Sequence, residues 1–362
     1  MLLKPSEDML GWQGTPGCGL TKRIQAALLL VLIAAFYVLT FSPYRLNLRL
    51  PSSTYTPASS LSSSQSPYAY VTLLAPNPKL DNEAFPDEED EYFVATRVLA
   101  YQLLHAQDTA TNSSIPFVVL VTPDVAESKV ERLRKDGATV KVVEKIKQEW
   151  MKPGIPRWRD MLSKLRMFEL TQYEKILFLD SDMFIVKRMD GIFTDETTEP
   201  LQSKPELIKA DEAPLPSSYI FAAQTYIDQR THAYPVTPED YFSGGFFLAK
   251  PSIELFRHYI SIAEIENRFD SNAMEQGLLN YAHRKDGPMP WAEVNYIYTT
   301  TWPSMQEYNA GAHSLHEKWW DQGIRLDPNL RKLWYIAKGE MLGFHEALES
   351  QEPRVGKDGS LA

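Results

Sequence analysis

The sequence predicts an α/β protein in which a parallel sheet carries helices on both faces. From residue 68 onward, short apolar runs alternate with segments whose apolar residues recur at helical spacing. The short runs are continuously apolar, which is typical of strands that are buried on both faces. Strands and helices that alternate in this order form parallel sheets, because each helix crosses back over one face of the sheet.

Residues 68–179 contain strands and helices in strict alternation, beginning and ending with a strand. The first strand is closed by the breaker Ala75–Pro78. Val94, Val98 and Leu104 have helical spacing in the segment that follows, and acidic residues before it suit a helix N-terminus. We expect strands at Tyr70–Leu74, Pro116–Val121, Ala138–Val143 and Lys175–Leu179, and helices at Tyr92–His105, Val125–Lys135 and Met161–Gln172.

Composition narrows the function classes. The chain of 362 residues has 37 basic and 47 acidic side chains, a formal net charge of −10, which excludes a general nucleic-acid binder. With 44% apolar and 23% charged residues the composition is that of a globular protein. The single cysteine, Cys18, excludes an intrachain disulfide and a cysteine-based zinc site. The sequence does not indicate an oligomeric state.

The N-terminal region predicts a membrane anchor. Ile24–Phe41 is an uncharged run that would span roughly 27 Å as a helix, enough for a thin bilayer of the early secretory pathway. A cleaved signal peptide has a shorter apolar region of about 7–15 residues and a small-residue cleavage site, which this chain lacks. A buried core helix is the other alternative, and the Ser/Pro-rich stretch that follows does not suit it. We expect a cytosolic tail at 1–23, a signal anchor at 24–41 and a stem at 42–67.

This layout predicts a single-pass type II membrane protein. The working domain is expected at 68–350 and a flexible tail at 351–362, with the domain in the lumen. Asn112–Ser114 forms an N-glycosylation acceptor motif, which agrees with a lumenal position. Short anchors with Ser/Pro-rich stems are usual in the Golgi, which we favour over the endoplasmic reticulum.

Paired acids follow the most apolar strand. Asp180-Ser181-Asp182 comes directly after Lys175–Leu179, and carboxylates at i and i+2 of an extended chain point to the same side. Two hard oxygen donors suit Mg²⁺ or Mn²⁺ that holds a substrate diphosphate. The alternative is a pair of solvated loop acids, which would not explain why apolar residues resume at Met183. No glycine-rich dinucleotide or P-loop motif is present in the sequence.

Four motifs, in order along the chain, resemble those of the family 8 glycosyltransferases, the group that contains glycogenin. The block Leu165–Val186 resembles the D-x-D region of that family. Tyr241–Ser252 resembles its F-N-S-G-V-F…P-S segment, and Met274–Asn280 its D-Q-G-L-L-N segment. His313–Trp320 resembles the closing H-F-x-G-x-x-K-P-W motif, in a form most similar to fungal, membrane-anchored members.

The resemblance implies a GT-A fold, a Rossmann-like mixed sheet flanked by helices. It also implies a retaining glycosyltransferase that moves a hexose-type sugar from a UDP-sugar to an acceptor hydroxyl on a glycan or protein, with Mn²⁺ or Mg²⁺ as the ion. A metal on the paired acids, opposed by a lysine, would neutralise the charge that develops on the β-phosphate.

The family motifs assign roles to particular residues of this sequence. The donor nucleotide and sugar would contact Val71, Thr72, Leu73, Lys164, Asp180, Ser181, Asp182, Ser243, Gly244, Gly245 and Lys318. Glu275, Gln276 and Lys318 would act at the reaction centre, with no covalent nucleophile assigned. The metal would be held by Asp180 and Asp182 with a histidine, His316 or His313.

Two departures from the family pattern bear on activity. The family has six positions from its histidine to its lysine, whereas His313 lies five and His316 two before Lys318. Ser243 and Gly244 stand where the family has Asn and Ser. These departures favour an alternative, a catalytically inactive GT-A scaffold that binds a nucleotide sugar or glycan. A metal-dependent phosphohydrolase or nucleotidyltransferase would need a further acid or base beside Asp180.

A polar, proline-containing segment, 195–218, interrupts the pattern as an insertion. An insertion of this length is typical of a binding loop or lid, or of a disordered segment.

Overall fold

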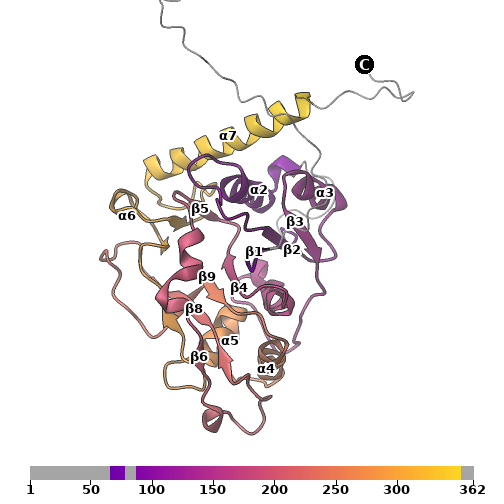
Figure 1. Ribbon diagram of the computed structural model, residues 1–362, viewed down its shortest axis with the longest axis vertical. Coiled ribbons are helices and arrows are strands. Elements are labelled where there is room, and N and C mark those ends of the chain that lie inside the picture. The colour runs from indigo at the N-terminus through magenta and orange to yellow at the C-terminus, as the bar shows by residue number, and fades with distance from the viewer. Residues whose placement is uncertain (1–65, 78–86, 352–362) are drawn as a thin grey trace, which may run out of the picture. The chain divides into compact units, whose positions relative to one another are not determined.

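The computed structural model describes residues 66–77 and 87–351 of the chain (Figure 1). The predicted cytosolic tail and signal anchor, almost all of the predicted stem, and the predicted C-terminal tail from residue 352 lie outside the described residues. Within the described ranges, no helix combines the length and the apolar character needed to cross a bilayer.

A seven-stranded sheet with the order β10-β8-β9-β4-β1-β2-β3 forms the centre of the molecule (Figure 1). Four strands from the first half pair in parallel: β1 (Tyr68–Leu74), β2 (Phe117–Val121), β3 (Thr139–Val142) and β4 (Lys175–Leu179). The other strands are β8 (Phe221–Thr225), β9 (Phe242–Ala249) and β10 (Ala292–Glu293).

The predicted mixed α/β sheet is confirmed, and the parallel pairing expected from residues 68–179 holds for β1 to β4. Strand β9 runs antiparallel to both β4 and β8, while β10 is again parallel to β8. The prediction of parallel pairing came from residues 68–179, where it holds. The reversal at β9 follows a long excursion of the chain through residues 186–241, which carries no regular strand–helix alternation.

Helices cover both faces of the sheet because its strands are apolar on both sides. Val71 of β1 packs in one core with residues of η3 (Met161–Glu169), α4 (Ile253–Ala263) and α5 (Glu275–Ala282). Tyr70 points to the other face and packs with α2 (Glu91–Leu104) and α3 (Glu127–Lys135). The burial that holds these layers together is the main stabilising contribution to the fold.

The segment predicted as a helix at 161–172 is a 3₁₀ helix that ends at Glu169. Its fully buried residues Leu162, Leu165 and Phe168 recur every third position. A 3₁₀ helix has three residues per turn, so this spacing places all three on one face.

A second sheet brings the C-terminal region beside the end of β4. Its order is β11 (Thr300–Thr301), β12 (Ser314–His316) and β5 (Met183–Ile185). Strand β12 is antiparallel to β5, and the register places His316 opposite Met183. The helices α6 (Met305–Ala310) and α7 (Pro328–Gln351) complete this side, where α7 packs on α2 in a third apolar core.

The insertion predicted at 195–218 has a defined structure. It contains two short 3₁₀ helices, η5 (Glu196–Thr198) and η6 (Pro205–Leu207), and a small hairpin of β6 (Leu201–Gln202) and β7 (Ser218–Tyr219). Glu212 anchors it, because its Oε1 accepts hydrogen bonds from Tyr281 at 2.6 Å and from Arg268 at 2.9 Å. The remaining short 3₁₀ segments are η1 (Asp87–Glu89), η2 (Pro156–Trp158), η4 (Asp190–Thr194) and η7 (Ser271–Ala273).

Candidate active site

A pocket of about 350 Å³ opens where β4 ends, with a smaller one of about 80 Å³ beside it. The carboxyl ends of β1 and β4 lie next to each other because the two strands are parallel neighbours, and ligands of α/β sheets gather at this edge. The residues that follow β1, Ala75–Asn77, line the smaller pocket. Six residues line both pockets, namely Arg157, Trp158, Met161, Asp180, Asp182 and Lys318.

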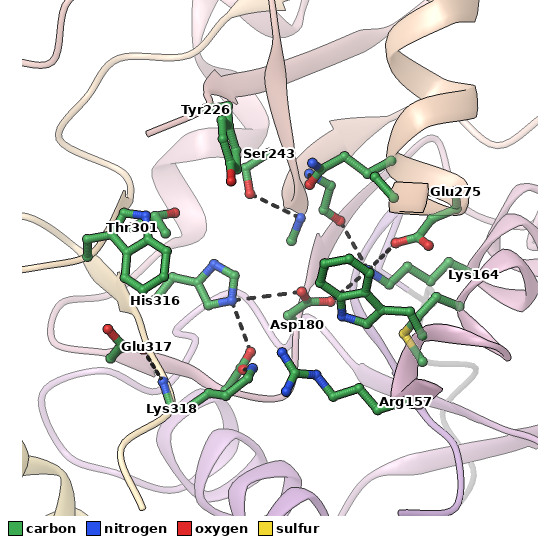
Figure 2. Close-up of a pocket in the computed structure, with 18 of the residues that line it drawn as sticks. Arg157, Lys164, Asp180, Tyr226, Ser243, Glu275, Thr301, His316, Glu317 and Lys318 are labelled. Carbon is green, nitrogen blue, oxygen red and sulfur yellow. Dashed lines mark hydrogen bonds and ion pairs between the residues drawn. The ribbon is translucent and has the colours of Figure 1, made fainter. Parts of the chain in front are cut away.

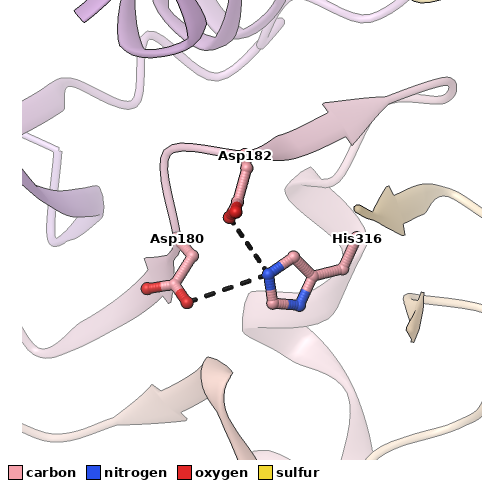
Figure 3. A group of neighbouring side chains, drawn as sticks. All are labelled: Asp180, Asp182 and His316. Atoms are coloured by element: carbon pink, nitrogen blue, oxygen red, sulfur yellow. Dashed lines mark hydrogen bonds and ion pairs between the residues drawn. The ribbon is translucent and has the colours of Figure 1, made fainter. Parts of the chain in front are cut away.

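Asp180, Asp182 and His316 form a compact group of possible metal ligands, with one ligand atom from each lying within 4.8 Å of the others (Figure 3). Nε2 of His316 is 3.0 Å from Oδ1 of Asp182 and 3.8 Å from Oδ2 of Asp180. Two carboxylates and an imidazole suit Mn²⁺ and related first-row ions, and Mg²⁺ would use the carboxylates with water. The residues present therefore fit the divalent ion that the sequence predicts.

Hydrogen bonds to the backbone fix the positions of Asp180 and Asp182. The amide of Asp180 donates to the carbonyl of Gly245 at 2.8 Å, and the indole of Trp319 donates to the carbonyl of Asp182 at 2.8 Å. Gly245 also lies against the ligands themselves, since a Cβ atom there would be 2.6 Å from Cε1 of His316. Any side chain at position 245 would collide with the candidate metal group.

Charge is concentrated around Asp182. Its side chain is nearly buried, and Lys318 Nζ lies 2.7 Å from Oδ2. Burial opposes ionisation of Asp182, but Lys318 and His316 outweigh it and hold the pKa of Asp182 well below its ordinary range. Burial likewise opposes protonation of His316, and the carboxylates of Asp182 and Asp180 overcome it and raise the pKa of His316. Without a metal, these groups form a network of opposite charges.

Lys164 joins the metal group to the other side of the pocket (Figure 2). Its Nζ, on a side chain only 4% exposed, lies 2.9 Å from Oδ1 of Asp180 and 2.6 Å from Oε1 of Glu275. Burial opposes its charge, but the two carboxylates hold the pKa of Lys164 above its ordinary value. Burial raises the pKa of Glu275, against the opposing effect of Lys164. Gln276 is fixed as well, because its Oε1 accepts a hydrogen bond from the amide of Gly244 at 2.8 Å.

Most of the predicted site residues are brought together. Ser243, Gly244 and Gly245 line the larger pocket with Lys164, Glu275, Gln276, His316 and Lys318. Leu73 and Ser181 line the smaller one.

Three predicted residues lie apart from the pockets. Val71 and Thr72 are fully buried in β1 and line neither pocket. The ring of His313 packs edge-on against Tyr298, with ring centroids 5.4 Å apart, and lies outside the candidate metal group. Of the two histidines considered for the metal, the structure places His316 with the carboxylates. The insertion at 195–218 contributes no residue to either pocket.

Several pocket residues were missed by the sequence analysis. Arg157 lines both pockets, and its guanidinium makes no hydrogen bond or ion pair with any residue in the part of the chain that the structure describes. It lies 5.8 Å from the ring of Trp158. Tyr226, Arg230 and Trp302 line the far side of the larger pocket. Arg157 and Trp158 belong to the short 3₁₀ helix η2 and the other three residues to loops, where no periodicity marks them. The one available signal is the Arg-Trp pair that begins seven residues before Lys164.

The chain has relatives of similar sequence, and its fold is similar to that of solved structures. No protein-family model matches the chain. An uncharacterized protein of Schizosaccharomyces pombe is 34% identical over 291 residues, 72% of this chain and 77% of the relative. Galactinol synthase 6 of Arabidopsis thaliana is 24% identical over 204 residues, which are 54% of this chain and 55% of that protein. A glycogenin of Komagataella phaffii is 28% identical over 126 residues, 35% and 24% of the two chains.

Among solved structures, the galactosyltransferase LgtC in complex with donor and acceptor sugar analogues aligns with a TM-score of 0.47 at 13% identity. The alignment covers 75% of this chain and 95% of LgtC.

Proposed function

Because this chain belongs to the glycogenin and galactinol synthase-like family 8 glycosyltransferases and has a mixed sheet of the GT-A type, we propose that it transfers a hexose from a UDP-sugar to an acceptor hydroxyl. One observation carries the proposal. Two carboxylates and a histidine converge at the sheet edge, with Lys164 and Lys318 on either side, inside a pocket of about 350 Å³. Such a set of groups fits a sugar diphosphate.

The transfer exchanges one bond at the anomeric carbon, C1, for another. The acceptor oxygen forms a bond to C1, the C1–O bond to the β-phosphate breaks, and its electron pair leaves with UDP, whose phosphate takes the hydroxyl proton. A divalent ion bound by Asp180, Asp182 and His316 would supply charge neutralisation to the diphosphate. The chain itself adds Lys318 and Arg157, two cations that line both pockets. Cations placed where negative charge develops are the main catalytic device that this site offers.

The two pockets divide the donor between them. The smaller one, lined by Leu73 and Tyr92, suits the nucleoside because it lies beyond the end of β1. The hexose would then lie beside Lys164, Glu275 and Gln276 in the larger pocket. Lys164 positions the two carboxylates that flank this space. Retention of configuration is proposed from the family resemblance alone.

The test is release of UDP by the full-length protein from a panel of UDP-sugars, with and without Mn²⁺. Asp180→Asn and Asp182→Asn remove the candidate ligands, and Asp286→Asn, at a side chain that is 90% exposed, is the matched control. We expect release that needs metal, persists in the control and is lost in both ligand variants. Metal-dependent UDP binding without any release would favour the scaffold alternative. No UDP binding at all would refute the proposal.

We also propose that the domain lies in the lumen of the Golgi, attached by the run at 24–41. The support is the sequence pattern of the anchor and stem, together with Asn112, which is exposed in a loop before β2. A glycan on Asn112 would be removed by an endoglycosidase and would be absent from Asn112→Gln. An endoglycosidase-dependent mobility shift that is present in the wild-type protein and lost in Asn112→Gln supports lumenal topology. A wild-type protein that shows no such shift contradicts lumenal topology.

A further inference from the structure

Part of the larger pocket is left over when the donor is placed. Its far wall comes from the loop after β8, from the end of β11 with the residue that follows it, and from the loop after β12, and it includes Tyr226, Arg230, Thr301, Trp302 and Asp321. Within the described residues, none of them makes a hydrogen bond or an ion pair with the candidate metal group. The inference below rests on the proposed function: if the hexose of the donor lies beside Lys164, this wall is on the side from which an acceptor would reach it.

Two aromatic rings on this wall are held in place. Tyr226 is 36% exposed and packs at 83° against Tyr241, with ring centroids 5.7 Å apart. Its hydroxyl points into the pocket (Figure 2). The indole of Trp302 donates to the carbonyl of Ile227 at 2.7 Å, and Arg230 lies 4.1 Å over its ring. Rings fixed before binding lose little conformational freedom when a ligand arrives.

Fixed polar groups stand beside the rings. Arg230 donates from Nη1 to Oε2 of Glu317 at 2.7 Å, and the Glu317 side chain is only 4% exposed. The same Nη1 donates to the carbonyl of Arg325, so the guanidinium is held by two partners. Its remaining N–H groups are free to meet a ligand because the side chain is 34% exposed. Asp321 accepts a backbone hydrogen bond from Gly323 through Oδ1 and adds a carboxylate to the wall.

We propose that this wall is a subsite for a six-membered ring that carries hydroxyl groups, and that Tyr226 determines its specificity. The C–H edges of such a ring are weakly positive and suit the negative face of an aromatic ring, while its hydroxyls match the guanidinium and carboxylate. A lipid chain would leave those charges unpaired. A peptide added as a strand would need a longer edge than β11, which is two residues long. The ring is either the terminal pyranose of a glycan or a free cyclitol.

The test is saturation-transfer NMR on the full-length protein with UDP and Mg²⁺, in a detergent without a sugar headgroup. The probes are methyl glucosides, galactosides and mannosides, myo-inositol, and a peptide that contains Ser and Tyr. We expect ring protons of one probe to receive saturation. A methyl glycoside that responds identifies a glycan acceptor, and myo-inositol identifies a cyclitol.

Variants assign the signal to the wall. Tyr226→Ala should weaken ring binding by about tenfold, the scale of a lost aromatic contact, whereas Tyr226→Phe keeps the ring and should retain binding. Tyr335→Ala, at a 42% exposed tyrosine of α7, is the matched control. UDP binding measured on each variant reports whether the donor half is folded. Binding of the peptide alone, no ring binding, or ring binding that survives Tyr226→Ala would overturn the inference.

Failure of this inference differs from failure of the proposed function. The NMR measurement needs no turnover, so the subsite is tested even if no UDP-sugar releases UDP. Conversely, metal-dependent UDP release with no ring binding would leave the transferase standing and remove the subsite.

Discussion

Gly245→Ala would displace the candidate metal ligands without removing any of them. A Cβ atom at this position would lie 2.6 Å from Cε1 of His316 and 2.8 Å from Oδ2 of Asp180. Ordinary contact begins at 3.4 Å, so the imidazole would have to move by about 0.8 Å. Neither neighbour can move freely, because β12 holds His316 opposite Met183 and Lys164 holds Asp180.

A displacement of this size exceeds the tolerance of a metal site, where ligand distances vary by about 0.2 Å. Mutations of the outer groups that orient metal ligands typically cost about 10–100-fold in metal affinity or activity, and we take this as the scale for a displaced ligand. We therefore expect Gly245→Ala to bind Mn²⁺ about 10–100-fold more weakly, which corresponds to about 1.4–2.8 kcal/mol. Titration calorimetry of Mn²⁺ in the presence of UDP measures the effect, and UDP release in the same protein should fall with it.

Gly339→Ala is the matched control, since a Cβ atom at position 339 of α7 meets nothing within 4 Å. It should leave metal affinity unchanged and add about 0.5–1 kcal/mol of stability, because alanine favours a helix over glycine. Thermal unfolding of the metal-free proteins separates a local effect from loss of the fold. A folded Gly245→Ala protein that binds Mn²⁺ like the wild type would refute the reasoning.

Three further predictions follow from the charges of the site. Burial opposes protonation of His316, but the carboxylates of Asp182 and Asp180 outweigh it and raise the pKa of His316. In the metal-free protein this group therefore adds stability below about pH 6.5 that is lost as pH rises through the raised pKa. A metal needs the neutral imidazole, so the rise in melting temperature caused by Mn²⁺ should grow as pH increases from 6 to 8. A rise in melting temperature that is constant over this range contradicts His316 as a metal ligand. Arg157→Ala should weaken UDP binding by about tenfold or more through loss of a charge-assisted contact, measured by calorimetry; unchanged affinity would exclude the phosphate role. Arg230→Gln leaves Glu317 buried without its cation and should cost about 1–3 kcal/mol in urea unfolding, reduced because Arg230 is partly exposed, and the double variant with Glu317→Gln should recover part of the loss.

The first half of the fold could be predicted because its signal is local. Lys175–Leu179 is confirmed as a strand at the predicted residues. The observed ends of β1 and β3 differ from the predicted ones by at most two residues. Strands β1 and β4 are largely apolar runs, which report their burial without reference to the rest of the chain, whereas β3 is a mostly exposed strand at the edge of the sheet. The antiparallel return of β9 has no such local signal, since its pairing with β4 joins residues about seventy positions apart.

Some site residues likewise have a local signal in the sequence, and others have none. Asp180 and Asp182 could be found because they stand directly after a strong strand, and Lys318 because it lies in a recognisable motif. Arg157 and Tyr226 could not, since a loop residue enters a pocket only through the path of the whole chain.

The sequence by itself determined the class of the protein, the strand from which the acids project and the two histidines that could join them. Tertiary structure decided between those histidines. Alternate residues of a strand point to opposite sides, and the pairing of β12 with β5 turns His316 toward Asp180 and Asp182 while His313, just before the strand, packs on Tyr298. The register between distant strands is a property of the folded chain, and it determines which imidazole faces the carboxylates.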